Sequence, residues 1–311
     1  MVCNNMISKH LLLFSLLILL SIHLSAQEKS SAVSEITLIA STPADSLLKS
    51  VFRIPQEERI DFVRWNLVLK NKNNIRSFLL NINYGESQQN TLGFTGGGQK
   101  RSLNGTFTIT RGYHNNPVTE VYHLQSKDLS TVLSIVRISE NLFHLLTSDQ
   151  RLMTGNGGWS YSLNNKDVMI DLPPNSFTSS AALLKDTALH IIYEGRTPCA
   201  AFAKHTNLAT NECLKVKWDL QLHRDPVTHL PTTYRLNRTQ HRKSAIEGKW
   251  KIIKGFGSNP HAMIYQLDPD QPDDTISLLA GDENVLFFIG INKQLLVGDH
   301  NFSFTLNRRR Q

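Results

Sequence analysis

The sequence predicts an all-β protein made of two tandem, homologous domains, each folded as a small β-barrel. Three observations lead to this prediction: an internal repeat that covers most of the chain, a series of short segments in which apolar and polar residues alternate, and very little helical periodicity. Each copy of the repeat is long enough to enclose a core of its own, so we expect a pair of domains and not a solenoid of short units.

The repeat is clearest when residues 103–164 are placed over residues 246–307, at a constant offset of 143 and without gaps, where 15 of 62 positions are identical. The match continues upstream at an offset of 153, where the segment RWNL at 64–67 faces KWDL at 217–220. The change of offset places ten extra residues in the first copy, within the polar, glycine-rich segment 85–102. Such an insertion predicts a longer surface loop between two strands.

Short strands are predicted throughout the second copy. The segments KWDLQLHR and KWKIIK alternate with the period of two that is typical of a half-buried strand, and the strands end at turn-forming residues. Eight short strands joined by short turns favour an up-and-down barrel or a closely related sandwich. The expected strands are Leu214 to His223, Thr232 to Arg238, Gly248 to Lys254, Ala262 to Leu267, Thr275 to Leu279, Val285 to Ile289, Gln294 to Val297 and Phe302 to Leu306.

The first residues have the layout of a cleaved secretory signal. Lys9 precedes an apolar run from Leu11 to Ile22, and small residues end at Ala26. The run is short for a membrane anchor, so we expect a periplasmic or secreted protein without stable membrane insertion. The expected organisation is a signal peptide at 1–26, a first barrel at 27–166, a linker at 167–187 and a second barrel at 188–311.

Cysteine use supports this compartment. After removal of the signal, the chain keeps only Cys199 and Cys213, and the first copy has Ala44 and Ile60 at the matching positions. An even pair in an oxidising compartment predicts a disulfide, worth about 3 kcal/mol in the chain-entropy model. Two unrelated buried thiols are the alternative.

The chemistry-bearing residues do not form a catalytic pattern. The sequence contains no Gly-x-Ser-x-Gly, His-Glu-x-x-His or Cys-x-x-Cys motif, so we expect neither an enzyme nor a cofactor. A net charge of +7 without a basic stripe argues against nucleic acid. Seven of the ten histidines after residue 26 lie in the second copy, but their spacing specifies no metal site; they are His190, His205, His223, His229, His241, His261 and His300.

Four aromatic residues recur at matched positions of the two copies. Trp65 matches Trp218, and Phe107 matches Trp250. They are expected to be core aromatics beneath the barrel rim, and the alternative is that they contact a ligand inside the barrel.

The segment YEGRTPC at 193–199 resembles the opening motif of the NlpE-like envelope proteins, a bacterial family known for copper resistance or homeostasis. The resemblance extends to Leu220-Gln221-Leu222 and to Gly248-Lys249-Trp250, which match the family's Leu-x-Leu and Gly-x-Trp strands. It implies lipocalin-like barrels at the bacterial envelope. Two features depart from the family: Phe202 stands where its second cysteine is expected, and the lipid-bearing cysteine is missing.

The resulting functional hypothesis is an exported binding or sensing module of the envelope, with a role in metal (copper) homeostasis or stress sensing. The alternative is a structural or protein-interaction component of the envelope, for which the loop at 85–102 would be a contact surface. Accordingly, the expected partner is a small ligand, a metal ion or an envelope protein.

Overall fold

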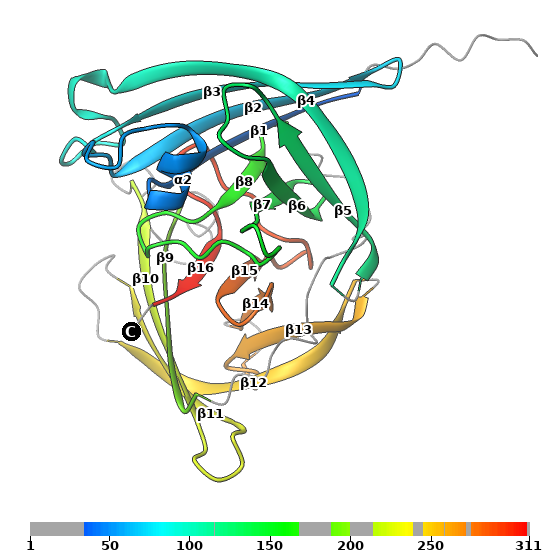
Figure 1. Ribbon diagram of the computed structural model, residues 1–311. Helices are drawn as coiled ribbons and strands as arrows, with labels where there is room; N and C mark the ends of the chain where they lie inside the picture. The colour runs from blue at the N-terminus through cyan, green and yellow to red at the C-terminus, as the bar shows by residue number, and fades with distance from the viewer. Residues whose placement is uncertain are drawn as a thin grey trace, which may run out of the picture.

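The protein consists of two closed antiparallel β-barrels of eight strands each, joined in tandem (Figure 1). This computed structural model describes residues 34–114, 116–167, 188–199, 214–238, 245–257, 259–271 and 275–309. Strands that are consecutive in the chain are neighbours in each barrel, and the last strand pairs with the first. The prediction of two tandem barrels is therefore confirmed, and the up-and-down alternative is the one that the chain adopts.

The first barrel contains eight strands and one short helix. Strand β1 closes the barrel by pairing with β2 on one side and β8 on the other. The elements are β1 (Ser34–Pro43), α2 (Ser46–Val51), β2 (Phe62–Lys72), β3 (Ile75–Gly85), a short 3₁₀ turn (Thr95–Gly97), β4 (Gln99–Tyr113), β5 (Asn116–Gln125), β6 (Leu133–Ser139), β7 (Leu142–Leu145) and β8 (Ser162–Asn165).

The second barrel repeats this plan without the helix among its described residues. Strand β9 pairs with both β10 and β16 and so closes it. The strands are β9 (His190–Thr197), β10 (Val216–Arg224), β11 (Pro231–Arg238), β12 (Ile246–Phe256), β13 (Asn259–Leu267), β14 (Ile276–Ala280), β15 (Val285–Ile289) and β16 (Thr305–Arg308).

One predicted strand was wrong. The segment Gln294 to Val297 makes only an isolated bridge, between Leu295 and Ile289, because the chain turns tightly there and the amide of Gly290 donates to the carbonyl of Gln294. The eighth strand is β9 instead, which the strand prediction omitted.

The barrel interiors are filled by side chains that alternate along the strands. In β2, for example, every second residue from Val63 to Leu69 is buried, as the period of two requires. Matched tryptophans anchor both cores: Trp65 Nε1 donates to Thr42 Oγ1 over 2.8 Å, and Trp218 Nε1 donates to Thr197 Oγ1 over 2.9 Å. The same packing and the same buried hydrogen bond thus recur in both repeats.

The short helix α2 covers one end of the first barrel and was not predicted. Asp45 caps it, because its carboxylate accepts a hydrogen bond from the amide of Leu48 over 2.9 Å. Leu48 and Val51 point into the barrel core. In the described ranges, no helix is long and apolar enough to span a membrane.

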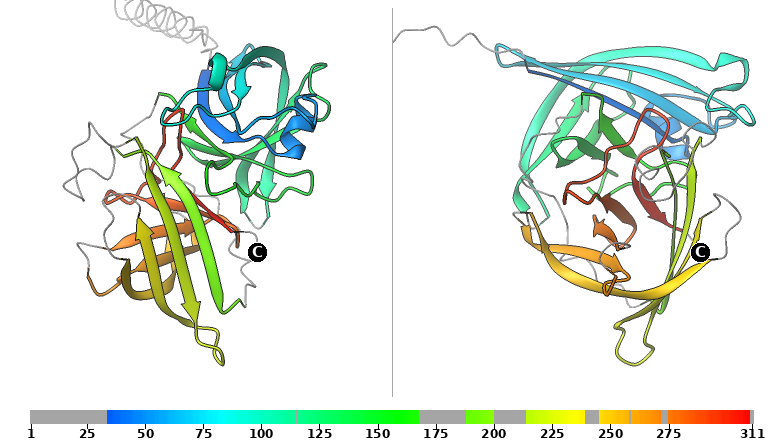
Figure 2. Two further views of the ribbon diagram at one scale, coloured as in Figure 1. Left: turned by 90° about the vertical axis from the view of Figure 1, so that its left-hand side faces the viewer. Right: turned by 180° about the vertical axis from the view of Figure 1, so that it is seen from behind.

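The two barrels pack against each other through matched residues. Ser160 Oγ lies 2.5 Å from Ser303 Oγ, and Ser162 Oγ lies 2.8 Å from Thr305 Oγ1. The members of each pair are 143 residues apart, which is the offset of the repeat. An approximate twofold axis therefore relates the two barrels, and these hydroxyl pairs lie close to it. The two barrels lie one beside the other in the left-hand view of Figure 2.

Two buried asparagines make the same contact in opposite directions. The amide of Gly298 donates to Asn164 Oδ1 over 2.8 Å, and the amide of Gly155 donates to Asn307 Oδ1 over 2.8 Å. Asn164 matches Asn307 in the repeat, and Gly155 matches Gly298. This reciprocity is the signature of the isologous interface of a symmetric dimer, here formed within one chain.

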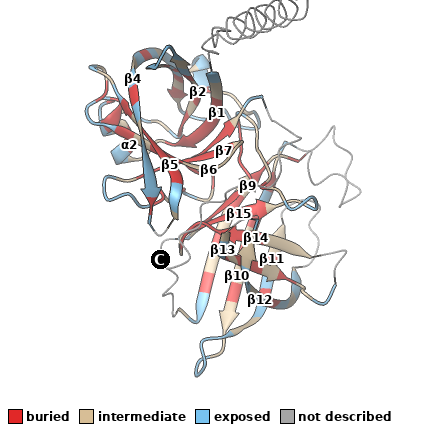
Figure 3. Ribbon diagram, turned by 90° about the vertical axis from the view of Figure 1, so that its right-hand side faces the viewer, coloured by how far each residue is buried: buried red, intermediate tan, exposed pale blue. Residues whose placement is uncertain are grey.

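An apolar cluster surrounds these polar contacts. It joins β5, β6 and β7 of the first barrel to β13, β14 and β15 of the second, and buried positions accordingly lie on β7 and β15 near the middle of the molecule (Figure 3). Its buried members are Tyr113, Val121, Val136, Ile138, Leu142, Leu146, Leu152, Ala262, Ile264, Leu279, Val285, Phe287 and Leu295.

Two titratable groups are buried at this junction. His144 packs edge-on against Phe287, its matched residue, with ring centroids 5.7 Å apart. Its Nε2 lies 2.9 Å from the carbonyl oxygen of Met153, which can only accept, so Nε2 carries the proton and Nδ1 accepts from Ser162 Oγ over 3.0 Å. Burial lowers the pKa of His144 from 6.5 to about 4. Conversely, burial raises the pKa of Asp282 from 3.8 to about 6, although two backbone amides donate to its carboxylate.

Candidate binding site at the barrel junction

A pocket of about 140 Å³ lies between the two barrels. Its lining contains two pairs of residues that match in the repeat, Phe62 with Lys215 and Trp159 with Phe302. The pocket therefore lies near the approximate twofold axis and takes its walls from both repeats.

The insertion found in the first repeat forms one wall of this pocket. Residues 87–93, which belong to the extra segment, all line it. The loop is held as a small hairpin by a bridge between Ser87 and Phe94 and by the hydrogen bond from the Gln88 amide to the Gly93 carbonyl. Its base is tied to Asp61, whose carboxylate accepts from the Ser87 amide over 2.7 Å and from its hydroxyl over 2.6 Å.

A stack of aromatic rings supports the same wall. Phe62 is stacked on Phe94 with centroids 4.1 Å apart, and on Trp159 with centroids 4.7 Å apart, at an interplanar angle of 15° in each case. Phe94 belongs to the insertion and Trp159 to the loop before β8. The stack thus fixes the loop to the barrel.

Arg64 lies beside this stack. Its guanidinium is within 5.5 Å of the ring centroids of Phe62 and Phe94, and it donates to the Leu92 carbonyl over 2.6 Å and to Asn301 Oδ1 over 2.8 Å. Burial lowers the pKa of Arg64, an effect that Asp299 partly opposes. Arg64 therefore joins the insertion to the second barrel.

The second repeat contributes two further cations. The guanidinium carbon of Arg196 lies 5.4 Å from the centre of the Trp159 ring, and Lys215 Nζ lies 5.8 Å from that of Phe302. Burial lowers the pKa of both groups, and the positive charges of Arg196 and Lys217 lower that of Lys215 further. In the described part of the chain, the Arg196 guanidinium has neither a hydrogen-bond acceptor nor a carboxylate within bonding distance.

A second pocket, of about 460 Å³, lies elsewhere along the junction. It is lined in part by Asp61, Glu194 and Arg309. Here the charges are already paired, because Arg309 contacts both Glu194 and Asp219. The charged groups of this pocket are therefore less available to a charged ligand than those of the first pocket.

The four aromatics singled out from the sequence lie in the barrel cores and do not line the junction pocket. Trp65, Phe107, Trp218 and Trp250 are all at most 5% exposed. They pack with core neighbours. Trp250, for example, packs against Tyr265 with the two rings tilted, and its indole N–H donates to the carbonyl of His223. In the structure they are core residues.

The cysteine and signal-peptide predictions involve residues outside the described ranges. Cys199 is buried in the core cluster of the second barrel, whereas Cys213 is not among the described residues. The disulfide therefore stays a prediction. The signal peptide at 1–26 and nearly all of the linker at 167–187 also lie outside the described residues.

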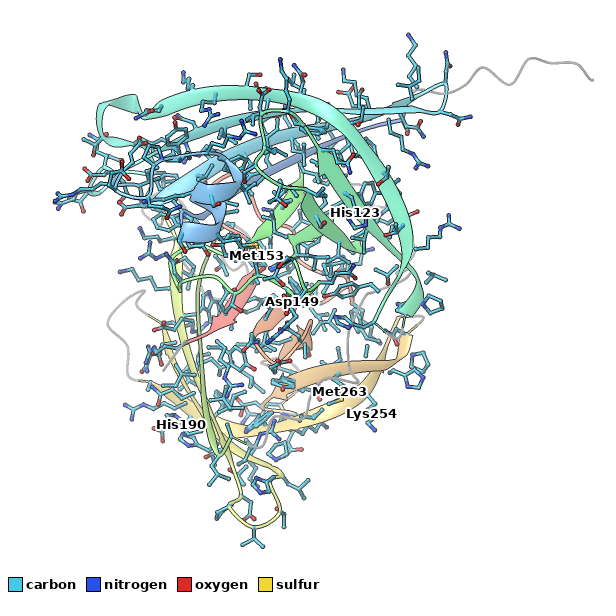
Figure 4. The ribbon with its side chains drawn as sticks, in the orientation of Figure 1. His123, Asp149, Met153, His190, Lys254 and Met263 are labelled. Atoms are coloured by element: carbon cyan, nitrogen blue, oxygen red, sulfur yellow. The ribbon has the colours of Figure 1, made fainter. Side chains whose placement is uncertain are left out.

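The structure brings together one pair of the predicted histidines. His190 and His223 are opposite each other on β9 and β10, with their rings stacked 4.7 Å apart. This pair lies far from the junction, as the position of His190 shows (Figure 4). Across the described ranges, no group of three or more His, Cys, Asp or Glu side chains is placed to hold a metal ion. His205 and His241 fall outside those ranges.

Sequence reasoning found the insertion but not the residues that it encloses. Arg196 was noticed only as part of the YEGRTPC motif, and nothing in its spacing indicated that it would stack on Trp159 from the other repeat. No protein-family model, curated protein or solved structure matches this chain. The site is therefore argued from its own geometry.

Proposed function

We propose that this protein is an exported, non-catalytic binding module of the cell envelope, in which the two barrels act as one unit and hold a ligand at their junction. One observation carries the proposal: the insertion that breaks the symmetry of the repeat is the segment that encloses the junction pocket. A loop added at this one place, and fixed there by Asp61, Arg64 and the aromatic stack, has the position expected of a recognition loop.

The packing of the barrels supports a site between them. Lipocalin-like barrels of eight strands can hold one small ligand or be filled by side chains. Here the cores contain large, fully buried residues such as Trp65, Phe52 and Tyr161 in the first barrel and Tyr193 and Tyr265 in the second. With the interiors occupied in this way, the junction offers the better place for a ligand.

The signal-like N-terminus and the NlpE-like motif support the envelope location of this proposal. Both are arguments from the sequence. The alternative is a protein-interaction component of the envelope. In that case the insertion would contact an envelope protein instead of a small ligand.

The proposal is tested by shortening the insertion. Replacing Gln88 to Gly93 by Asn-Gly keeps the bridge between Ser87 and Phe94 and closes it with a two-residue hairpin turn. We expect a folded protein with a melting temperature close to that of the wild type, but without the ligand that the wild-type protein retains when isolated from its own compartment. Native mass spectrometry of both proteins provides the measurement.

Retention of the same ligand by the shortened protein would show that the junction is not the binding site. Loss of a protein partner in a pull-down, with no small ligand on either form, would support the protein-interaction alternative. A substitution outside the pocket, Asn66→Ala on an exposed position of β2, serves as the folded control.

Metal handling is a second candidate function, favoured by the pair His190 and His223. Two imidazoles on adjacent strands can supply two nitrogen ligands to Cu²⁺ or Zn²⁺. The pKa of His223 is lowered by burial and by His190, a direction that favours the neutral ring that a metal ion needs. Copper titration by calorimetry should show binding that His223→Asn abolishes and that His261→Asn, at an exposed position, leaves intact. Equal binding by all three proteins would exclude this pair.

A further inference from the structure

We propose that the junction pocket binds an oxyanion, namely the phosphate, sulfate or carboxylate group of its ligand, with Arg196 and Lys215 as the principal contacts and Arg64 at the opposite side. This inference rests on the proposed function, because it names the chemical class of ligand for the same pocket. It follows from the charge of the lining, the geometry of Arg196 and the size of the cavity.

The described lining of the pocket carries positive charge. Among the residues that the structure describes, the charged ones in its lining are Arg64, Arg196 and Lys215, and none is acidic. Asp299 is the acid whose charge acts on the pKa of Arg64. Its carboxylate accepts hydrogen bonds from the amides of Asn301 and Phe302 over 2.7 and 2.9 Å. Positive side chains that line one half-buried pocket create a positive potential there, which favours the binding of an anion between them.

Arg196 is positioned before any ligand arrives. One face of its guanidinium lies over Trp159, whose own backbone is fixed because the amides of Gly158 and Trp159 both donate to Asn156 Oδ1 over 3.0 Å. Ring stacking leaves the N–H groups at the edge of the guanidinium, where they can donate to two oxygens of one oxyanion. Since these groups have no acceptor among the described residues, a bound oxyanion would supply one.

The size of the cavity limits what enters it. A volume of about 140 Å³ is close to that of the engineered apolar cavity of about 150 Å³ that admits benzene. One oxyanion group with the atoms next to it therefore fits, and a larger ligand must extend over the rim. Gln88, Gln89 and Asn90 of the insertion line the pocket and can hydrogen-bond to hydroxyl or water oxygens there.

The two cations Arg196 and Lys215 occur in only one copy of the repeat, so the pocket has one anion site and not a symmetric pair of sites. The positions that match Arg196 and Lys215 in the first copy are Ser41 and Phe62, so the positive charge from these positions comes from the second repeat alone. Phe62 instead builds the aromatic wall. The pocket consequently has positive charge from Arg196 and Lys215 on the side of the second repeat, although it lies near a twofold axis.

Binding is tested on the mature protein with sodium phosphate, sodium sulfate and sodium glucuronate, each at an ionic strength held constant with sodium chloride. We expect at least one anion to raise the melting temperature saturably and to give a calorimetric isotherm with one site. Arg196→Gln should weaken this affinity at least tenfold, and Arg196→Lys, which keeps the charge but loses the fork, should weaken it less. Arg76→Gln, at an exposed position of β3, should bind like the wild type.

Three results would overturn the oxyanion site: no saturable effect of any anion at constant ionic strength, equal affinity of wild type and Arg196→Gln, or an equal loss in Arg76→Gln. The melting temperatures without anion show that each variant is folded. Comparing free sulfate with a sulfated polysaccharide then distinguishes a free ion from a group carried on a polymer.

This test separates the two proposals. If the protein with the shortened loop loses its natural ligand while Arg196→Gln retains it, the oxyanion inference is wrong and the junction remains the binding site. If the shortened protein retains the ligand, the proposed function itself fails.

Discussion

The two titratable groups buried at the junction should make opposite contributions to the dependence of stability on pH. The folded-state pKa of His144 is lowered from 6.5 to about 4. Its contribution is therefore fully present above pH 6.5 and is lost as the pH falls towards 4. At about 1.4 kcal/mol per pH unit, the loss amounts to about 3 kcal/mol in the free energy of unfolding.

Asp282 acts in the opposite sense. Its folded-state pKa is raised from 3.8 to about 6. The carboxyl group therefore contributes most when protonated, and its contribution falls as the pH rises from 3.8 through 6. The change is again about 3 kcal/mol. In the wild-type protein the two effects largely cancel between pH 4 and pH 6.5.

The assay is urea unfolding of the wild type, Asp282→Asn and His144→Gln at several pH values from 4 to 8. Relative to the wild type, Asp282→Asn should gain about 3 kcal/mol at pH 8 and lose this advantage at pH 4, because the amide oxygen can still accept from the two backbone amides. The deficit of His144→Gln should be largest above pH 6.5 and should shrink on acidification. Free energies of both variants that run parallel to the wild type over this range would refute the reasoning.

Three further predictions concern packing. Asn307→Ala should lower the free energy of unfolding by about 1–3 kcal/mol, because the buried amide of Gly155 in the other barrel loses its acceptor. Asn66→Ala, at an exposed position of β2, should have little effect, and equal effects of the two substitutions in urea unfolding would contradict this. Gly155→Ala places a Cβ atom 2.2 Å from a backbone carbonyl oxygen, so we expect a loss of more than about 2 kcal/mol, and a melting temperature like that of the wild type would show that the backbone can yield. Trp218→Phe removes the indole donor of a buried hydrogen bond to Thr197 and should cost about 1–3 kcal/mol by thermal unfolding, whereas an unchanged stability would mean that water replaces the donor.

Most of the fold could be predicted from the sequence because its determinants are local. Alternation along segments such as KWDLQLHR identifies strands, and the repeat identifies the domain pair. The strand β9 was missed and the segment Gln294 to Val297 was wrongly included, since closing a barrel depends on pairing between strands far apart in the chain. A short apolar segment by itself does not show whether it has a partner.

The candidate site was harder to predict for the same reason. Its insertion is visible as a change of offset, but the other described residues of the lining come from five separate parts of the chain, represented by Arg64, Trp159, Arg196, Lys215 and Asn301. Their proximity depends on how the second barrel docks on the first. Docking in turn depends on matched polar pairs such as Asn164 and Asn307, which are ordinary asparagines in the sequence.

The reciprocal junction has a consequence for how the chain assembles. Because each barrel presents contacts that are complementary to their own counterparts, the first barrel of one molecule can dock on the first barrel of another, as well as on its own second barrel. During synthesis the first barrel is completed before its intended neighbour exists. Covalent linkage then favours the neighbour in the same chain, since a tether of moderate length gives an effective concentration in the millimolar range. Crowded chains that emerge together would instead exchange partners, and the yield of monomer should fall as expression rises.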